Sequence, residues 1–114
     1  MKYFSLDEFK CSHSGENQIV PEFVEKLDHL REECGFPFVI TSGYRCHWHP
    51  VEMKKERPGM HTKGIAADIK ISNGFQRYLL IKKALEHGFT GIGVAKTFIH
   101  LDTRMDTPVI WTYS

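Results

Sequence analysis

The sequence predicts an α+β fold, a small and mostly antiparallel sheet backed by two main helices. Residues 21–34 and 75–86 repeat apolar residues at helical spacing. Short runs rich in β-branched or alternating apolar residues lie between and after them. The connections between the last three runs are short, which favours antiparallel pairing. A chain of 114 residues can bury one core, so we predict a single domain over residues 1–114.

The first two helices are marked by the residues at their ends. Ser5-Leu6-Asp7-Glu8 is a capping box, with Phe4 and Phe9 placed as a hydrophobic staple, and it predicts a short N-terminal helix. Pro21 in the first turn and Gly35 past the last turn bracket a longer helix. The apolar side of this second helix consists of Phe23, Val24, Leu27 and Leu30. We expect it to cover the core.

The first clear strand is Phe38 to Ser42, and it carries Gly43-Tyr44-Arg45 at its end. Strand ends are where a rigid scaffold presents functional side chains. From the residues alone, Arg45 is either such a group or a surface arginine paired with a glutamate. His47 to Met60 is the longest irregular stretch, which predicts a binding loop or a mobile lid. We interpret it as one wall of a substrate groove.

Two later strands carry residues of the metal-ligand type. Alternation from Ile65 to Ile71 puts Asp68 opposite the isoleucines, and alternation from Thr97 to Asp102 puts His100 and Asp102 on one face. If these strands pair, Asp68 and His100 converge, and the glycine-flanked turn before Ile65 can bring His61 to the same place. Two imidazoles and one carboxylate form a catalytic zinc set with one open position. Spacing alone leaves hydrogen-bonded histidines and an edge aspartate as the alternative.

The C-terminal half completes the expected layers. Ser72 and Asn73 are good caps for a second main helix over Phe75 to Glu86, and Gly88 ends it. We predict that its apolar face consists of Phe75, Tyr78, Leu79, Ile81 and Leu85. Strands over 92–94, 98–102 and 109–112 then finish the sheet.

Three motifs in a fixed order raise the zinc interpretation above the alternative. They are Ser42-Gly43-Tyr44-Arg45, His61-x-x-Gly64-x-Ala66-x-Asp68 and Phe98-Ile99-His100-Leu101-Asp102. From about Phe4 to Trp111, the chain resembles the zinc D-alanyl-D-alanine carboxypeptidase family. The relatives of that family include D-Ala-D-Ala dipeptidases, phage endolysins that cut L-alanyl-D-glutamate bonds, and the hedgehog signalling domain.

The resemblance implies a hedgehog/DD-peptidase-like fold, a site and a substrate. It makes His61, Asp68 and His100 the ligands of Zn²⁺, and Arg45 the clamp on a substrate carboxylate. It implies hydrolysis of a peptide bond next to a D-amino acid in peptidoglycan stem peptides, by a carboxypeptidase or by an endolysin-type endopeptidase. The peptidoglycan peptide is then the expected partner, and we expect a monomer.

The general base is where the chain departs from the family. Family peptidases carry Glu or Asp three residues before the last ligand, or His two before it, whereas this chain has Thr97 and Phe98. Neither takes a proton from water at neutral pH. Asp102, on the face of His100, is the nearest substitute, and its alternative role is to bond a ligand histidine or Arg104. The gap keeps a second hypothesis open, a non-catalytic zinc-containing binding or virion module on the same scaffold.

Composition limits the partners and the compartment. The chain has 15 Lys and Arg against 14 Asp and Glu, so it has no basic field for nucleic acid or an anionic membrane. It shows no membrane-spanning run and no signal-peptide core in residues 1–7, so we expect synthesis in the cytoplasm. The site of action, if the protein is phage-derived, is the cell wall.

The cysteines are an odd set, Cys11, Cys34 and Cys46, and we expect free thiols. Cys46-His47-Trp48-His49 is an alternative metal site, because it has one thiol and two imidazoles within four residues. Consecutive residues project in different directions, so one ion could use at most two of them.

Overall fold

The structure, a computed structural model, describes residues 1–53 and 59–113. The charged run Lys54, Lys55, Glu56 and Arg57, with Pro58, was expected to form part of the groove wall and lies outside the described residues.

A five-stranded sheet forms the centre of the molecule, with the strand order β1-β2-β4-β3-β5. Neighbouring strands are antiparallel except β3 and β5, which are parallel. The α+β class and the mostly antiparallel sheet are therefore confirmed. The strands are β1 Ile40–Ser42, β2 Ala66–Lys70, β3 Gly91–Val94, β4 Phe98–Asp102 and β5 Val109–Thr112.

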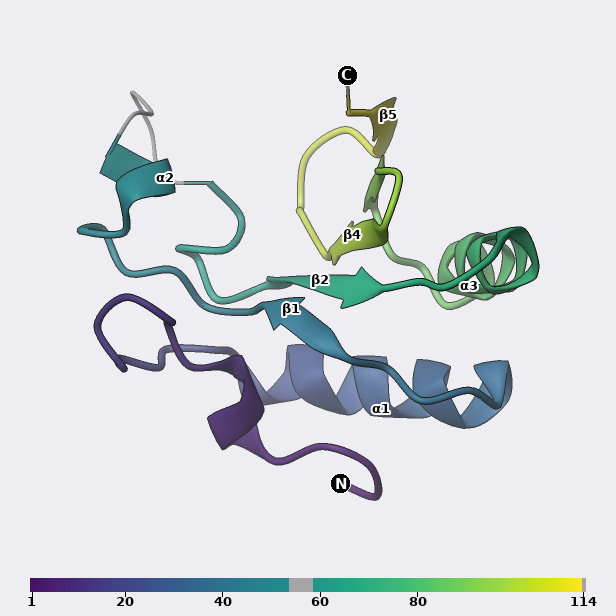
Figure 1. The fold of residues 1–114 in the computed structure, drawn as a ribbon, viewed down its shortest axis with the longest axis horizontal. Helices are drawn as coiled ribbons and strands as arrows, with labels where there is room; N and C mark the ends of the chain where they lie inside the picture. Colours follow the sequence, from purple (N-terminus) through teal and green to yellow (C-terminus); the bar gives the residue numbers. More distant parts are fainter. Residues whose placement is uncertain (54–58, 114) are drawn as a thin grey trace.

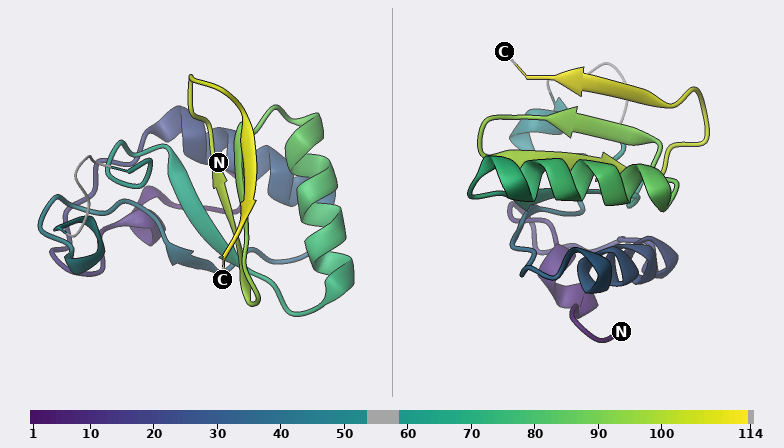
Figure 2. Two further views of the ribbon diagram at one scale, coloured as in Figure 1. Left: turned by 90° about the horizontal axis from the view of Figure 1, so that it is seen from above. Right: turned by 90° about the vertical axis from the view of Figure 1, so that its right-hand side faces the viewer.

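Two main helices, α1 (Pro21–Cys34) and α3 (Gly74–Glu86), contact each other and lie on one side of the sheet (Figures 1 and 2). Two short helical segments complete the chain: η1 (Leu6–Phe9) precedes α1, and α2 (Pro50–Met53) lies between β1 and β2. Figure 1 shows α2 on the left of the molecule and α3 on the right. Helix α3 and the described part of the long loop, which contains α2, thus lie on different sides of the molecule. Among the described residues, no helix combines the length and the apolar composition that crossing a membrane requires.

Alternation along β2 and β4 divides the molecule into a core side and a polar side. Ala67 and Ile69 of β2, with Ile99 and Leu101 of β4, are buried in the same core as the helices. The helices contribute Leu27 and Leu30 from α1, and Leu80 and Ala84 from α3. The intervening residues Asp68, His100 and Asp102 must then project from the opposite face of the sheet, because successive strand residues alternate.

Several predicted element ends agree with the structure. Helix α1 begins at Pro21 and is capped by Gly35 in the left-handed conformation, at φ 74°. Asn73 caps α3 by accepting a hydrogen bond from the Gln76 N–H at 2.9 Å. At the N-terminus, the Ser5 N–H donates to Glu8 Oε2 at 2.8 Å, and the rings of Phe4 and Phe9 pack edge to face.

The predicted N-terminal helix is instead a single 3₁₀ turn, η1, since Lys10 already has an extended backbone. The first strand is shorter than predicted. A register irregularity lies between Ile40 and Ser42, and Phe38 packs into the core before the strand begins. The Val39 carbonyl still accepts the Lys70 N–H at 2.9 Å.

The predicted apolar face of α3 is wrong for three of its five residues, whereas Leu79 and Ile81 are partly buried and pack against the core. Phe75, Tyr78 and Leu85 are 70%, 63% and 53% exposed, whereas Leu80 and Ala84 are fully buried. Leu80 and Ala84 are four residues apart and therefore lie on one face. This face packs inward, with Leu79 and Ile81 at its edges, while Phe75, Tyr78 and Leu85 remain outside.

Candidate metal centre

Strand pairing positions two of the predicted ligands. In the antiparallel register of β2 and β4, Asp68 lies directly opposite His100. The third, His61, comes from a tight turn in which the Gly64 N–H donates to the His61 carbonyl at 3.2 Å. Gly64 has a φ of 76°, and a Cβ there would lie 2.2 Å from the Gln18 carbonyl oxygen. Only glycine fits this turn, so the turn fixes where His61 points.

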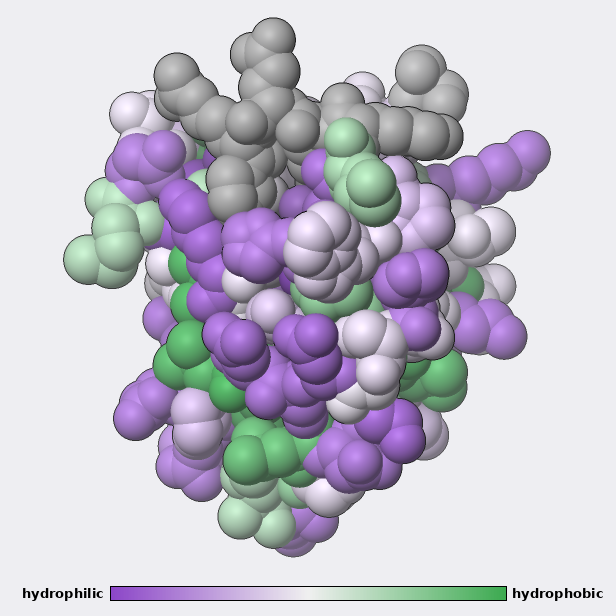
Figure 3. Space-filling model, turned by 90° about the vertical axis from the view of Figure 1, so that its left-hand side faces the viewer, coloured by the Kyte–Doolittle hydropathy of each residue, from purple (hydrophilic) through white to green (hydrophobic). Residues whose placement is uncertain are grey.

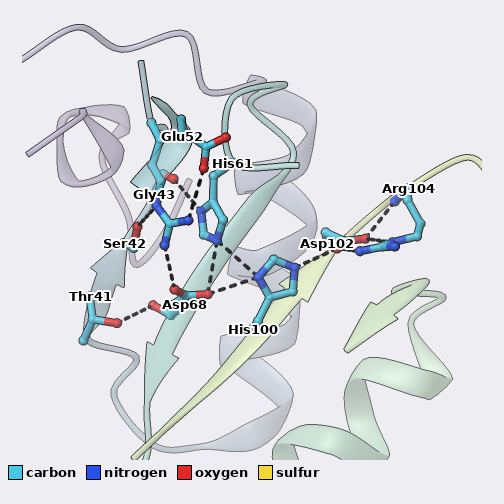
Figure 4. Close-up of polar contacts among 10 residues, drawn as sticks. Thr41, Ser42, Gly43, Glu52, His61, Asp68, His100, Asp102 and Arg104 are labelled. Atoms are coloured by element: carbon cyan, nitrogen blue, oxygen red, sulfur yellow. Dashed lines mark hydrogen bonds and ion pairs between the residues drawn. The ribbon is translucent and has the colours of Figure 1, made fainter. Parts of the chain in front are cut away.

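The three side chains bring one donor atom each to a common point (Figure 4). His61 Nε2 lies 3.2 Å from His100 Nδ1 and 3.3 Å from Asp68 Oδ1, and His100 Nδ1 lies 3.1 Å from Asp68 Oδ1. All three residues are buried. Zinc ligands at about 2.0–2.2 Å in tetrahedral geometry are roughly 3.3–3.5 Å apart, so these spacings fit a zinc ion with small adjustments.

Hydrogen bonds on the far side of each ring determine which nitrogen carries the lone pair. His61 Nδ1 lies 2.8 Å from the Gly43 carbonyl oxygen, and His100 Nε2 lies 2.7 Å from Asp102 Oδ2. Because both oxygens are acceptors, these nitrogens carry the hydrogens, and the lone pairs of His61 Nε2 and His100 Nδ1 face Asp68. Three acceptors meeting in a buried place need a proton on one ring or a metal ion between them, and the hydrogen bonds to Asp68 form when a ring is protonated.

The pKa shifts of Asp68 and His100 also indicate a site that favours a cation. Burial opposes ionisation of Asp68, but hydrogen bonds from His100 and His61 hold the pKa of its carboxyl well below its usual range. Burial also disfavours a charged His100, yet its hydrogen bonds to Asp102 and Asp68 raise the pKa of this imidazole. The site thus stabilises positive charge beside a permanent carboxylate, as a divalent cation requires.

Asp102 lies behind His100 and away from the other two ligands. Its side chain is fully buried and accepts a hydrogen bond from His100, as well as bonds from the Arg104 backbone N–H, Nε and Nη2 at 3.1, 3.0 and 2.7 Å. Burial raises the pKa of Asp102, but these hydrogen bonds more than offset it and keep the pKa well below its usual range. A carboxylate so placed orients a ligand histidine. This geometry favours that role over proton transfer.

Arg45 points toward the metal centre from the loop after β1. Its Nε donates to Ser42 Oγ at 3.1 Å, while Nη1 lies 3.4 Å from Glu52 Oε2 and Nη2 lies 3.5 Å from Asp68 Oδ2. The Arg45 side chain is 16% exposed. It is therefore held in place by one normal and two long contacts, and three contacts for five N–H donors leave donors that can reach an anionic ligand.

Glu52 in α2 is a site residue that the sequence interpretation missed. It is buried, and its Oε1 accepts from Thr62 Oγ1 at 2.9 Å and from the Gly59 N–H at 3.0 Å. Together with its contact to Arg45, this links the irregular loop to both Arg45 and the turn of His61. In the sequence it is one glutamate beside a charged run, and its burial had no local signal.

A cavity of about 510 Å³ opens beside the donor atoms, lined by Arg45, His61, Asp68 and His100. Its lining also includes the aromatic and apolar side chains of Phe98, Trp111, Tyr113 and Met60. The Trp111 ring lies 5.0 Å from that of His100. Figure 3 shows that the face turned to the left in Figure 1 is mostly polar, with its apolar residues in small groups. The cavity can hold several residues of a peptide.

The family comparison agrees with this geometry. The family described as Peptidase M15 matches residues 2–102. The chain belongs to the Peptidase M15 family. The match includes all three candidate ligands and Arg45, and it confirms the resemblance to D-alanyl-D-alanine carboxypeptidases. Among curated proteins, no match to the chain is found.

The M15 match ends before part of the cavity wall. Arg104, Trp111 and Tyr113 line the cavity but lie beyond residue 102, outside the matched segment. The rival Cys46 to His49 cluster does not form: within residues 1–53 and 59–113, the only group with metal-binding geometry is His61, Asp68 and His100.

Proposed function

We propose that this M15 family member is a zinc-dependent peptidase that hydrolyses a peptide bond next to a D-amino acid in peptidoglycan stem peptides. The observation that carries the proposal is the meeting of three acceptor atoms beside Arg45 in an open cavity. The family supports a peptide substrate, and the resemblance to carboxypeptidases and endolysins supports its peptidoglycan origin.

The residues of the chain have separable tasks in this proposal. Zinc, when bound, supplies Lewis-acid polarisation of a carbonyl and lowers the pKa of water. His61, His100 and one oxygen of Asp68 hold the ion, and Asp102 fixes the ring of His100. Arg45 binds a substrate carboxylate through its forked guanidinium. The wall of Phe98, Trp111 and Tyr113 packs against the stem peptide and excludes water.

A digestion experiment with paired metal analysis tests the proposal. Purified peptidoglycan is incubated with the zinc-loaded protein, with the protein after chelation, and with His100→Ala, and the masses of the released fragments are read. We expect the wild-type protein to bind one zinc per chain. We expect fragments cut next to a D-amino acid from the zinc-loaded protein, and none from the chelated protein or from His100→Ala. Full zinc occupancy in His100→Ala would remove the ligand assignment.

One observation favours a second candidate, a non-catalytic zinc-containing binding module. Among the described residues that line the cavity, Asp68 is the sole carboxylate, and it is already a ligand. The positions where M15 peptidases carry a base hold Thr97, which is exposed, and Phe98. If the protein holds one zinc per chain and binds peptidoglycan fragments without cutting any of them, this second function replaces the first.

A further inference from the structure

Cys11 and Cys46 form a buried thiol pair beside the loop that carries Arg45. Their sulfurs lie 3.4 Å apart, and each side chain is 1% exposed. We propose that these two cysteines are a reversible redox site, which closes to a disulfide when the folded chain meets a small-molecule disulfide. The inference does not depend on the proposed peptidase activity.

The backbone already holds the two cysteines side by side. The segment from Phe9 to Cys11 runs along the segment from Gly43 to Cys46, because the Tyr44 N–H donates to the Phe9 carbonyl at 2.7 Å and the Cys46 N–H donates to Cys11 Sγ at 3.3 Å. A disulfide requires about 2.05 Å between sulfurs, so the atoms must approach by roughly 1.4 Å. We expect small side-chain rotations to supply this movement, because backbone hydrogen bonds already hold the two segments together.

Cys11 is the more reactive of the two by environment. Burial alone would raise its pKa, but hydrogen bonds from the backbone N–H groups of Cys46, Ser14 and His13 lower the pKa of Cys11 to about 7. A substantial fraction is then thiolate at neutral pH, the nucleophilic form. Cys11 also begins the exposed loop of residues 12–18, so a local opening of that loop brings its sulfur to solvent.

The third cysteine provides an internal comparison. Cys34 lies at the end of α1, and burial raises the pKa of its thiol to about 11. It is therefore protonated at neutral pH and a poor nucleophile. Oxidation should select the Cys11 and Cys46 pair over Cys34.

The exchange with oxidised glutathione balances in two steps. The Cys11 thiolate attacks one sulfur of oxidised glutathione, forms a mixed disulfide and releases one glutathione thiolate. Cys46 then loses its proton and attacks Cys11 Sγ, which forms the protein disulfide and releases the second glutathione. Two protein thiols are oxidised, and one glutathione disulfide is reduced to two glutathione molecules.

Closure would tie the N-terminal segment to the metal centre. Cys46 follows Arg45 directly, and the nearby Gly43 carbonyl holds His61. The crosslink joins residues 35 apart in the chain. A loop of that size restricts the unfolded chain strongly, so the oxidised protein should melt on the order of 10 °C above the reduced protein.

The test uses the full chain, kept folded, in buffers of increasing oxidised-to-reduced glutathione ratio. Free thiols are trapped with N-ethylmaleimide after acid quenching, and the protein is digested with trypsin. Cleavage after Lys10, Arg31 and Arg45 places the three cysteines on separate peptides. We expect the Cys11 and Cys46 peptides to appear joined, two hydrogens lighter than the separate pair, with Cys34 still alkylated.

Two variants and the melting temperature complete the design. Cys34→Ser should behave as wild type, and Cys46→Ser should show no rise in Tm on oxidation. Alkylation of all three thiols at the most oxidising ratio would overturn the proposal. A stable glutathione adduct on Cys11 without the link to Cys46 would overturn it as well. The disulfide in the wild-type protein is located from its peptides without either variant. The proposal can therefore still be tested if Cys46→Ser does not fold.

Discussion

Each imidazole of the metal centre has its second nitrogen occupied by a protein acceptor. The Gly43 carbonyl serves His61, and the Asp102 carboxylate serves His100. The two acceptors affect their rings differently, because the carboxylate of Asp102 also raises the basicity of the imidazole that it bonds. Asp102 is therefore the residue at which the proposed orienting role and the proposed base role can be separated.

We predict that Asp102→Asn weakens zinc affinity by roughly 10–100-fold and leaves activity recoverable when zinc is added in excess. The amide keeps the shape of the side chain but carries no charge to hold His100 Nε2–H. Zinc content and rate are measured on the same sample. A variant that is fully metallated and slower by about 10² would instead show that Asp102 takes the proton.

Arg45 can be tested without disturbing the metal. We predict that Arg45→Lys binds zinc normally and loses about 10–100-fold in kcat/KM on a substrate with a free carboxylate, since a lost charge-assisted hydrogen bond costs about 1.5–3 kcal/mol. Arg77→Lys is the matched control, because Arg77 lies on α3, donates to the Lys96 carbonyl and does not line the cavity. Activity within about twofold of wild type would exclude Arg45 as the clamp.

At the scale of elements, strands were easier to predict than helix faces. In β2 and β4 the two-residue alternation has only two outcomes, and the isoleucines decide which face is buried, so the side of Asp68 and His100 followed from the sequence. In α3, large apolar residues surround much of the helix. The face that packs is decided by its fit to α1 and the sheet, and a small residue such as Ala84 gives no hydrophobic signal in advance.

Gly91 of strand β3 leaves room for Asp102 beside the metal centre. Gly91 lies opposite Asp102 in the sheet, and a Cβ at Gly91 would come within 2.1 Å of Asp102 Oδ1. The missing side chain makes the space in which the buried carboxylate bonds His100 and Arg104.

We predict that Gly91→Ala displaces Asp102 and thereby lowers both stability, by about 1–3 kcal/mol, and zinc affinity. Urea unfolding and zinc titration measure the two effects. Gly74→Ala is the matched control, because a Cβ there meets nothing within 4 Å. Unchanged zinc affinity in Gly91→Ala would mean that the position of Asp102 does not matter to the metal.

At the scale of the whole molecule, the N-terminal segment is fastened to both layers. Its Phe9 carbonyl bonds the loop after β1, and its first residues bond α1. Asp28 on α1 accepts from the Lys2, Tyr3 and Phe4 N–H groups at 3.0, 2.7 and 3.2 Å. The sequence does not indicate that Asp28 accepts these hydrogen bonds, because helical spacing alone does not tell a buried aspartate from an exposed one.

Asp28 makes part of the stability of this fold dependent on pH. Burial of Asp28 raises its pKa, but the three backbone hydrogen bonds outweigh burial and lower the pKa below its ordinary value. A carboxyl with a depressed folded pKa stabilises the protein above its unfolded pKa of about 3.9, and this contribution is lost as the pH falls through the folded pKa.

We therefore predict that Asp28→Asn destabilises the protein by about 1.5–3 kcal/mol at pH 7, because the amide offers these N–H groups a weaker, neutral acceptor. Urea unfolding at pH 7 and at pH 3 gives the difference between wild type and variant. Below the unfolded pKa of about 3.9 the unfolded carboxyl takes up a proton while the folded one still resists it, so the difference should begin to shrink by pH 3. The exposed Asp106 provides the control, and Asp106→Asn should remain close to wild type at both values. An Asp28→Asn penalty that stays constant between pH 7 and pH 3 would show that the shape of the side chain, and not its charge, fastens the N-terminal segment to α1.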